Sequence, residues 1–351
     1  MVVGGGAVGV ACAYELARRG ARVTLLESEP ELGLGCSYGN AGLVGSEVAT
    51  PLATPTALRE GMRWLFAPDA PFHAPLRPRL LPWMLRFALA SRRSRSAAAA
   101  RALLPLGRDS YRMHLEYAAA GLEVGLRQRG ALLTWETERG FAAGGPAHAQ
   151  EGTLLSGDEA RRAAPGLAPR IAGAVYVDAV AHCDSLLWTR GVGAAAAGLG
   201  AELAPGTAVR GLLVEGGRVS GVETEAGPLR AGVVVLAAGV WSRALLRPLG
   251  ISLPLEAGKG YHVDVDTAAG DPSLPVYMQE SHVVATPLGR CLRLAGTLEL
   301  SGLDASISTR RSDAVAAAAA RTLPGIGGRR RQEVWAGLRP CTADGIPVIG
   351  R

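Results

Sequence analysis

Residues 1–27 read MVVGGGAVGVACAYELARRGARVTLLE, and this stretch decides the fold. A short apolar start leads into a glycine-rich turn, a run with helical spacing follows, and residues 23–27 form a second apolar segment that ends in an acid. This order predicts a strand, a turn, a helix and a second strand, as in a nucleotide-binding βαβ unit. Gly4 permits the tight turn, Gly6 lets the backbone approach a pyrophosphate, and Gly9 lets the helix pack closely on the sheet.

The start of this helix and the acid beyond it complete a predicted dinucleotide site. The N–H groups around Ala7 and Val8 lie at the positive end of the helix, where they would face phosphates. Glu27 follows Gly9 by 18 residues, a spacing at which its carboxylate can accept hydrogen bonds from both ribose hydroxyls. A three-glycine match alone is weak, but here the helix stop at Gly20 and the acid occur in order. We therefore expect a bound dinucleotide rather than a structural glycine turn.

Length and composition favour a globular protein of two domains. The chain has 351 residues, and its 48% apolar content excludes global disorder. The net charge of +6 is carried almost wholly by arginine, because Lys259 is the only lysine. We interpret the arginines as a genomic bias and their tightest cluster, at residues 92–95, as a solvated helix face. No nucleic-acid partner is expected, since that would need a basic groove.

The cysteines and the apolar runs bear on the compartment. There are five cysteines, far apart and without a Cys-x-x-Cys pair, which argues against a disulfide frame or a metal site and fits a reducing compartment. No apolar run reaches the roughly 20 residues of a membrane span. We expect a cytoplasmic protein. Only three residues precede Gly4 and the chain stops in a strand-like segment, so both ends are expected to be incomplete.

Two segments allow more than one interpretation. The small and polar residues of 28–42 either bring backbone close to a ligand or form a plain surface loop. Residues 50–106 mix prolines, aromatic residues and arginines, which predicts short amphipathic helices. These helices either pack on the sheet or present a basic, aromatic-bearing surface to a membrane.

The remaining pattern predicts the rest of the elements. Asp184 should cap a helix over 185–197, and a strand buried on both faces should occupy 233–239. Residues 261–266 alternate strictly, which predicts a half-buried antiparallel strand, with 276–287 and 290–298 paired to it. Further helices are expected over 96–101, 108–129, 153–164 and from Ser312 or Asp313 to 321, strands over 130–135, 173–178 and 333–339, and a β-meander from 208.

Several motifs together resemble a known family. They are residues 4–27, SYGNAG at 37–42, AAGVWS at 237–242, GKGY at 258–261, and WAGLRP at 335–340 followed by Thr342, Asp344, Gly345 and Pro347. In this order they resemble the FAD-dependent D-amino acid oxidase superfamily, especially the bacterial D-amino acid dehydrogenase small subunits, with glycine oxidase next. The resemblance covers essentially the whole chain, and its terminal block is the most specific part.

The resemblance implies an α/β fold in which a Rossmann-like FAD-binding domain is interleaved with an α+β substrate domain built on an antiparallel sheet. Residues 1–50, 184–252 and 336–351 would form the FAD-binding domain, and residues 51–183 and 253–335 the substrate domain. Family members continue past the position of Arg351, so the C-terminal part of the FAD-binding domain is expected to be missing. The resemblance places FAD against Gly4, Gly6, Ala7, Val8, Gly9, Glu27, Ser37, Asn40, Ala41, Gly42, Val209, Ala238, Gly239 and Trp241.

The same resemblance implies the substrate site. Arg339 matches the family's carboxylate-binding arginine, for which a salt bridge at a strand end is the alternative. His282 aligns with a family tyrosine that helps to hold the carboxylate, a departure that affects substrate preference. Tyr261 and Lys259 are weaker pocket candidates, with sheet framework as the alternative. Some relatives attach flavin covalently to a cysteine. Cys341 is a candidate for such attachment, but its spacing from the neighbouring motif differs from theirs, which disfavours this role.

These observations predict an FAD-dependent enzyme that oxidises D-amino acids to 2-oxo acids and ammonia. A dehydrogenase is favoured, because the insertion at 64–87 is similar to one in the dehydrogenases. Residues 59–89 would then reach a quinone or the inner face of the plasma membrane. The alternatives are a glycine or sarcosine-type oxidase that uses oxygen, a subunit of a larger amine dehydrogenase, and a truncated non-catalytic remnant. The oligomeric state is left open.

Overall fold

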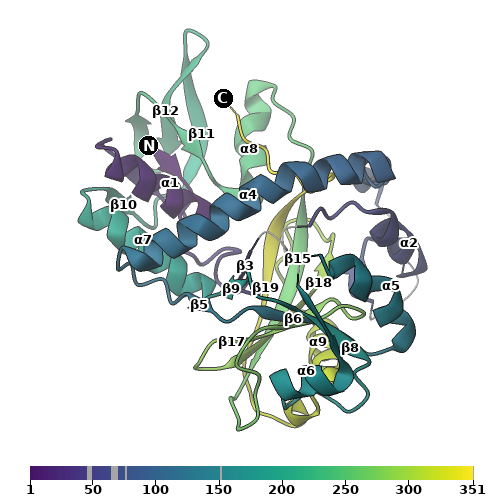
Figure 1. Ribbon diagram of the computed structural model, residues 1–351. Coiled ribbons are helices and arrows are strands. Elements are labelled where there is room, and N and C mark those ends of the chain that lie inside the picture. The colour runs from purple at the N-terminus through teal and green to yellow at the C-terminus, as the bar shows by residue number, and fades with distance from the viewer. Residues whose placement is uncertain (46–49, 65–69, 76, 151, 351) are drawn as a thin grey trace.

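A computed structural model of the protein describes residues 1–45, 50–64, 70–75, 77–150 and 152–350. Within these residues the strands form four sheets. Figure 1 shows an upper body that holds the N-terminus, α1 and α7, and a lower body built on the long strands β15, β18 and β19. Helix α4 (Arg93–Ala119) runs across the molecule between them.

The upper body contains the predicted nucleotide-binding unit. Its parallel sheet has the order β10 (Glu202–Ala204), β2 (Thr24–Leu26), β1 (Val2–Val3) and β14 (Val235–Leu236). Helix α1 (Ala7–Arg18) packs against α7 (Ser185–Gly198), and the side chains between them form one apolar core with Val2 and Leu25. The side chain of Asp184 accepts hydrogen bonds from the first backbone N–H groups of α7, which confirms the predicted cap.

The β-meander is confirmed, but the strand after it differs from expectation. Strands β11 (Val209–Glu215), β12 (Arg218–Thr224) and β13 (Gly227–Arg230) form the antiparallel meander. The expected strand over 233–239 is reduced to β14, and Val233 is 70% exposed. The prediction of burial on both faces was wrong because β14 is an edge strand, whose only partner in the described sheet is β1. The chain then continues through the 3₁₀ turns η2 (Gly239–Trp241) and η3 (Arg247–Leu249), with α8 (Ser242–Leu246) between them.

The lower body is built on a nine-stranded sheet that is mostly antiparallel. Its strand order is β19 (Arg331–Thr342), β15 (Leu255–Val265), β18 (Leu292–Glu299), β17 (Val283–Pro287), β16 (Val276–Met278), β6 (Ala131–Trp135), β8 (Gly173–Val177) and β7 (Thr153–Ser156), with β4 (Phe72–His73) beside β18. Strand β15 pairs with β18 and β19, whereas β17 pairs with β18 and β16. The expected direct pairing of 276–287 with β15 was therefore wrong.

Helices pack on both sides of this sheet. Helix α9 (Thr309–Thr322), with the 3₁₀ turn η4 (Pro324–Ile326), and α6 (Gly157–Ala163) enclose the largest apolar core with the side chains of β15, β17 and β18. Helix α5 (Glu138–His148) packs on the opposite side of β6 and β8, where its Phe141 joins Leu133, Trp135 and Val175 in a separate apolar cluster. At the other end lie α2 (Pro55–Trp64), the 3₁₀ turn η1 (Pro78–Leu80) and α3 (Leu81–Ala90). No helix of the described residues is long and apolar enough to cross a membrane.

Several predicted boundaries were wrong for local reasons. The helices expected at 96–101 and 108–129 are one helix, α4, which contains Pro105 in its interior. Helix α4 ends at Ala119, and the last residues of the expected helix include strand β5 (Arg127–Gln128). Strand β5 forms a small sheet with β9 (Ala181–His182) and β3 (Leu43–Val44). Residues 153–156 are strand β7, and α6 begins only after its cap Ser156. Helix α9 begins after Ser308, ahead of the expected Ser312 or Asp313.

Candidate active site

The glycine turn between β1 and α1 has the geometry that the sequence requires. Gly4 has a φ of +107°, and a Cβ there would lie 2.5 Å from the Ala237 carbonyl oxygen. A Cβ on Gly9 would lie 1.8 Å from the Gly4 carbonyl oxygen, so neither position accepts a side chain. A Cβ on Gly6 would meet only the Ser37 Oγ, at 3.3 Å. The outer side of the turn is therefore open to a phosphate.

Glu27 and Ser37 are both tied to this turn. The Glu27 carboxylate accepts hydrogen bonds from the Gly5 N–H at 2.5 Å and from the Glu29 N–H at 2.9 Å. The Ala7 N–H at the start of α1 donates to the Ser37 Oγ at 2.9 Å. The acid at the end of β2 and the loop beyond it are thus brought to the helix N-terminus, as the sequence predicted.

The remaining predicted cofactor residues of the upper body surround the same turn. Val209 and Ala238 pack with the ends of β1 and β2 in one apolar cluster. Gly239 has a φ of +54°, and a Cβ there would meet nothing within 4 Å, so bare backbone faces open space. Val8 and Trp241 are exposed, at 68% and 49%. This open backbone and the adjacent acid fit a bound dinucleotide.

The loop of residues 37–42 crosses from the upper body to the large sheet. The Asn40 carbonyl oxygen accepts a hydrogen bond from the Arg293 Nη1 at 3.4 Å, and the Ala41 carbonyl oxygen accepts one from the Thr286 Oγ1 at 2.7 Å. The Gly42 N–H donates to the Asn40 side chain at 2.7 Å. Side chains of β17 and β18 therefore hold this loop, and a plain surface loop is excluded.

A cavity of about 300 Å³ lies beyond this loop and contains two of the predicted catalytic residues. Arg339 of β19 and His282, which precedes β17, both line it, together with Ala41 of the loop. The other lining residues are mostly apolar: Leu52, Ala57, Glu60, Trp64, Pro71, Phe72, Phe87, Tyr277, Val284, Ala295, Gly296, Thr297 and Leu298. The structure thus places the expected carboxylate-binding group beside the expected cofactor loop.

Arg339 is held by a hydrogen bond to a backbone carbonyl oxygen. Its Nη1 donates to the Thr297 carbonyl oxygen at 3.0 Å, and no described carboxylate forms an ion pair with it. A Cβ on Gly260 of the neighbouring strand would lie 2.3 Å from the Arg339 Nη2, so the glycine makes room for the guanidinium. A half-buried guanidinium on the wall of a cavity, without a described ion-pair partner, is suited to a carboxylate.

His282 faces an acid that sequence reasoning missed. Its Nε2 lies 3.6 Å from a carboxylate oxygen of Glu60 on α2. Its ring lies edge-on to the Trp64 ring, with the ring centroids 5.7 Å apart. Glu60 and Trp64 are far from His282 in sequence, so no local signal could have joined them. Tyr277 was also missed, although its place between the core residues Val276 and Met278 assigns it to the opposite face of β16. Burial raises the pKa of Tyr277, so it remains a neutral donor.

Tyr261 and Lys259 do not reach this cavity, and their prediction as pocket residues was wrong. Both side chains point to the α9 side of β15, where the Tyr261 hydroxyl donates to Glu299 at 3.0 Å and the Lys259 Nζ donates to the Ser306 carbonyl oxygen at 3.1 Å. They are framework residues, the alternative that the sequence left open. Burial raises the pKa of the Cys341 thiol to about 11, which leaves it unreactive as a nucleophile.

A glycine turn that is open to a phosphate, followed by a loop that lines a cavity, indicates an enzyme that binds a dinucleotide cofactor. The family model for FAD dependent oxidoreductases (DAO) matches residues 1–351, and the chain belongs to this family. The cofactor is therefore FAD, and the open glycine turn with Glu27 fits it.

Individual relatives narrow the comparison. The chain is 35% identical over 373 residues to the D-amino acid dehydrogenase of Cereibacter sphaeroides (strain ATCC 17029 / ATH 2.4.9), with 100% of this chain and 84% of the relative covered. It resembles the structure of glycine oxidase from Bacillus cereus ATCC 14579 with a TM-score of 0.77 at 22% identity, covering 100% and 87% of the two chains. The glycine oxidase of Geobacillus kaustophilus gives a TM-score of 0.73 at 25% identity, covering 99% and 84%.

Proposed function

We propose that this protein oxidises D-amino acids to 2-oxo acids and ammonia. One observation carries the proposal: Arg339, which forms no ion pair with a carboxylate of the described residues, and the loop residue Ala41 line the same cavity. The name of the Cereibacter sphaeroides relative, which is similar over the whole of this chain, supports the same substrate class.

In this proposal the chain supplies binding and a dry site. Arg339 binds the substrate carboxylate, and the apolar walls receive the side chain and exclude water. FAD supplies the electron sink that takes the hydride from the substrate Cα. The amino acid enters with a neutral amine and leaves as an imine, which water hydrolyses to the 2-oxo acid and ammonia. Tyr277 and His282, which line the cavity with Arg339, are placed to complete the polar contacts of the substrate.

Arg339→Met tests the substrate site, because it keeps the length of the side chain and removes its charge. We expect the KM for D-alanine to rise at least 100-fold, while the flavin spectrum stays that of the wild type. Stopped-flow reduction under anaerobic conditions measures the effect, and Arg310→Met serves as a control. Wild-type kinetics in Arg339→Met would remove this residue from the site.

We further propose that the enzyme is a dehydrogenase that passes electrons to a membrane quinone. The support is the surface of residues 59–89, of which 65–69 and 76 lie outside the described residues. Its exposed apolar side chains are Met62 at 56%, Leu81 at 58% and Leu85 at 63%, and its exposed arginines are Arg59, Arg63, Arg77, Arg79 and Arg86. Apolar groups among arginines suit the interface of an anionic bilayer.

The double variant Leu81→Gln/Leu85→Gln tests this surface. We expect it to lose at least tenfold in binding to phosphatidylglycerol vesicles while turnover with a soluble dye is unchanged. Leu199→Gln, an exposed leucine just after α7 on the other body, is the matched control.

The likeness to glycine oxidases supports the alternative, an oxidase that uses oxygen. Rapid oxygen consumption, with no reduction of ubiquinone analogues, would favour that alternative.

A further inference from the structure

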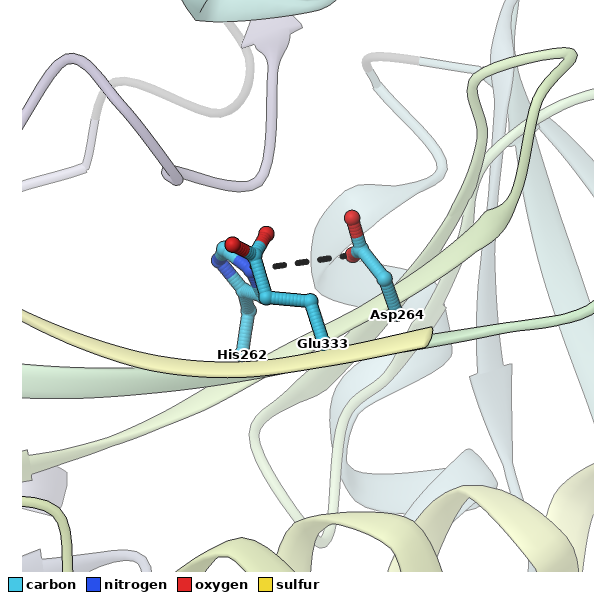
Figure 2. Close-up of side chains that lie close together, drawn as sticks. All are labelled: His262, Asp264 and Glu333. Carbon is cyan, nitrogen blue, oxygen red and sulfur yellow. Dashed lines mark hydrogen bonds and ion pairs between the residues drawn. The ribbon is translucent and has the colours of Figure 1, made fainter. Parts of the chain in front are cut away.

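Three titratable side chains gather on the side of the large sheet that faces the cofactor loop. His262 and Asp264 come from β15 and Glu333 from β19, and the ligand atoms of all three lie within 4.8 Å of one another. Figure 2 shows the imidazole of His262 beside the Glu333 carboxylate, with Asp264 further along the strand. His262 and Asp264 are fully buried, and the Glu333 side chain is 32% exposed.

The cluster is a hydrogen-bonded unit rather than a cation site. The Nε and Nη2 of Arg293 donate to the two oxygens of Asp264, each at 2.9 Å. Arg290 adds a further contact to Asp264 at 3.6 Å. Asp264 and Arg293 therefore form a buried pair without net charge, and the guanidinium group of Arg293 occupies the place that a cation would take.

The geometry assigns a proton to the other pair. The Nδ1 of His262 lies 2.9 Å from the Gly39 carbonyl oxygen, which can only accept, so Nδ1 carries a hydrogen and donates. The Nε2 then faces a carboxylate oxygen of Glu333 at 3.2 Å and one of Asp264 at 3.8 Å. A bare nitrogen lone pair against two carboxylates would be repulsive. The short contact therefore needs a proton between the Nε2 and Glu333.

We propose that His262 and Glu333 share one proton, and that this proton positions the cofactor loop on the sheet. With it, the cluster of His262, Glu333, Asp264 and Arg293 is neutral. Without it, the negative charge of Glu333, whose side chain is 32% exposed, faces the bare lone pair of the buried His262 Nε2. Loss of the proton would therefore release the loop rather than leave the contact intact. The proposal rests on the FAD site proposed above.

The loop residues beside this proton are tightly fitted. The Tyr38 hydroxyl donates to the other oxygen of Glu333 at 2.5 Å. The Trp335 ring stacks on the His262 ring with the centroids 5.3 Å apart, and it lies tilted against the Tyr38 ring with the centroids 5.5 Å apart. A Cβ on Gly39 would lie 2.3 Å from the His262 Nδ1, so only glycine fits there. The next residues along the loop, Asn40 and Ala41, belong to the FAD and substrate sites.

The groups around the cluster act on His262 in both directions. Tyr38 faces it from the loop, and Arg290 faces it from the turn before β18, where it also pairs with Asp184 at 3.0 Å. Burial, and then the charge of Arg293, lower the pKa of His262, whereas the charge of Asp264 and the hydrogen bonds to Gly39 and Glu333 act in the opposite direction. A full imidazolium is therefore disfavoured, and sharing with Glu333 avoids it.

Two variants of Glu333 separate the proton from the packing. Glu333→Gln keeps the shape, donates an amide hydrogen to the Nε2 and does not titrate, whereas Glu333→Leu removes the partner. The readout is the FAD dissociation constant of the apoprotein between pH 6 and 9, measured from flavin fluorescence. We expect wild-type affinity to fall at least tenfold at the alkaline end, Glu333→Gln to be flat, and Glu333→Leu to be weak throughout. Asp266→Asn, just beyond β15, is the control and should follow the wild type.

A measurement without cofactor keeps the proposal separate from the FAD site. ¹⁵N NMR of histidine-labelled apoprotein should show the His262 Nδ1 protonated and an Nε2 signal intermediate between protonated and bare nitrogen at pH 7. Glu333→Leu should shift only the Nε2 signal. A bare Nε2 in the wild type would overturn the shared proton even if FAD binds. Failure to bind FAD, with the intermediate Nε2 signal present, would overturn only the FAD site.

Discussion

The two faces of strand β15 are both buried, but different contacts bury them. On the α9 side, Tyr261, Val263 and Val265 enter the largest apolar core. On the loop side, His262 and Asp264 are equally inaccessible, yet each of their polar atoms has a partner. The expectation of a half-buried strand was wrong because the loop of residues 37–42 covers the polar face. Alternation therefore identifies which residues share a face, but it does not identify which face meets water.

The polar face should be the more fragile of the two. Asp264→Asn leaves the Arg293 guanidinium buried without its counter-charge, which costs about 3–5 kcal/mol. Urea unfolding followed by circular dichroism measures the loss. The double variant Asp264→Asn/Arg293→Met should recover part of it, because neither partner is then left charged. Equal stability of Asp264→Asn and the wild type would contradict the account of this face.

A substitution on the apolar face should lower the free energy of unfolding without changing the FAD affinity. Leu294→Ala, a fully buried position of β18 beside Val263, removes packing and leaves a cavity that costs about 2–4 kcal/mol. We expect the FAD affinity of the remaining folded protein to equal that of the wild type, because no loop contact is touched. A large loss of FAD affinity in this variant would show that the two faces are coupled.

Acid should weaken the polar face more than the apolar one. Burial raises the pKa of the Asp264 carboxyl, but the hydrogen bonds and charge of Arg293 outweigh it and hold the pKa below its usual value. A carboxyl with a lowered pKa stabilises the fold above its unfolded pKa of about 3.9, and this stability is lost as the pH falls through the folded value. Unfolding free energies measured from pH 6 to pH 3 should therefore fall less steeply for Asp264→Asn than for the wild type.

The smallest expected effect lies at the edge of the polar face. Thr286→Val removes the hydrogen bond to the Ala41 carbonyl oxygen and should cost about 1 kcal/mol, with a several-fold weaker FAD affinity. Thr224→Val removes a comparable hydrogen bond, to Gly227 in the meander, and serves as the control. It should lose stability without changing the FAD affinity. Identical FAD affinities in the two variants would remove Thr286 from the loop support.

The sequence predicted those parts of the molecule that local chemistry determines. The glycine turn, Asp184 as a helix cap and the alternation of β15 follow from neighbouring residues, and the structure has them. Arg339 and His282 were predicted from the family resemblance, and both line the cavity. Glu60, Trp64 and the loop contacts of His262 could not be predicted, because they join segments more than 200 residues apart. The error over Tyr261 has the same origin, since nothing near it says which side of β15 faces the cavity.

Strand β19 carries Glu333, Trp335, Gly337 and Arg339 on a single face, so the residue that contacts the loop of residues 37–42 and the residue that lines the cavity belong to one strand. The opposite wall of the cavity comes from α2 and α3, which contribute Ala57, Glu60, Trp64 and Phe87. Selection or protein engineering can therefore exchange that helical wall to admit new side chains. Such exchanges would leave Glu333 and Arg339 unchanged, because both belong to β19 and not to the helices.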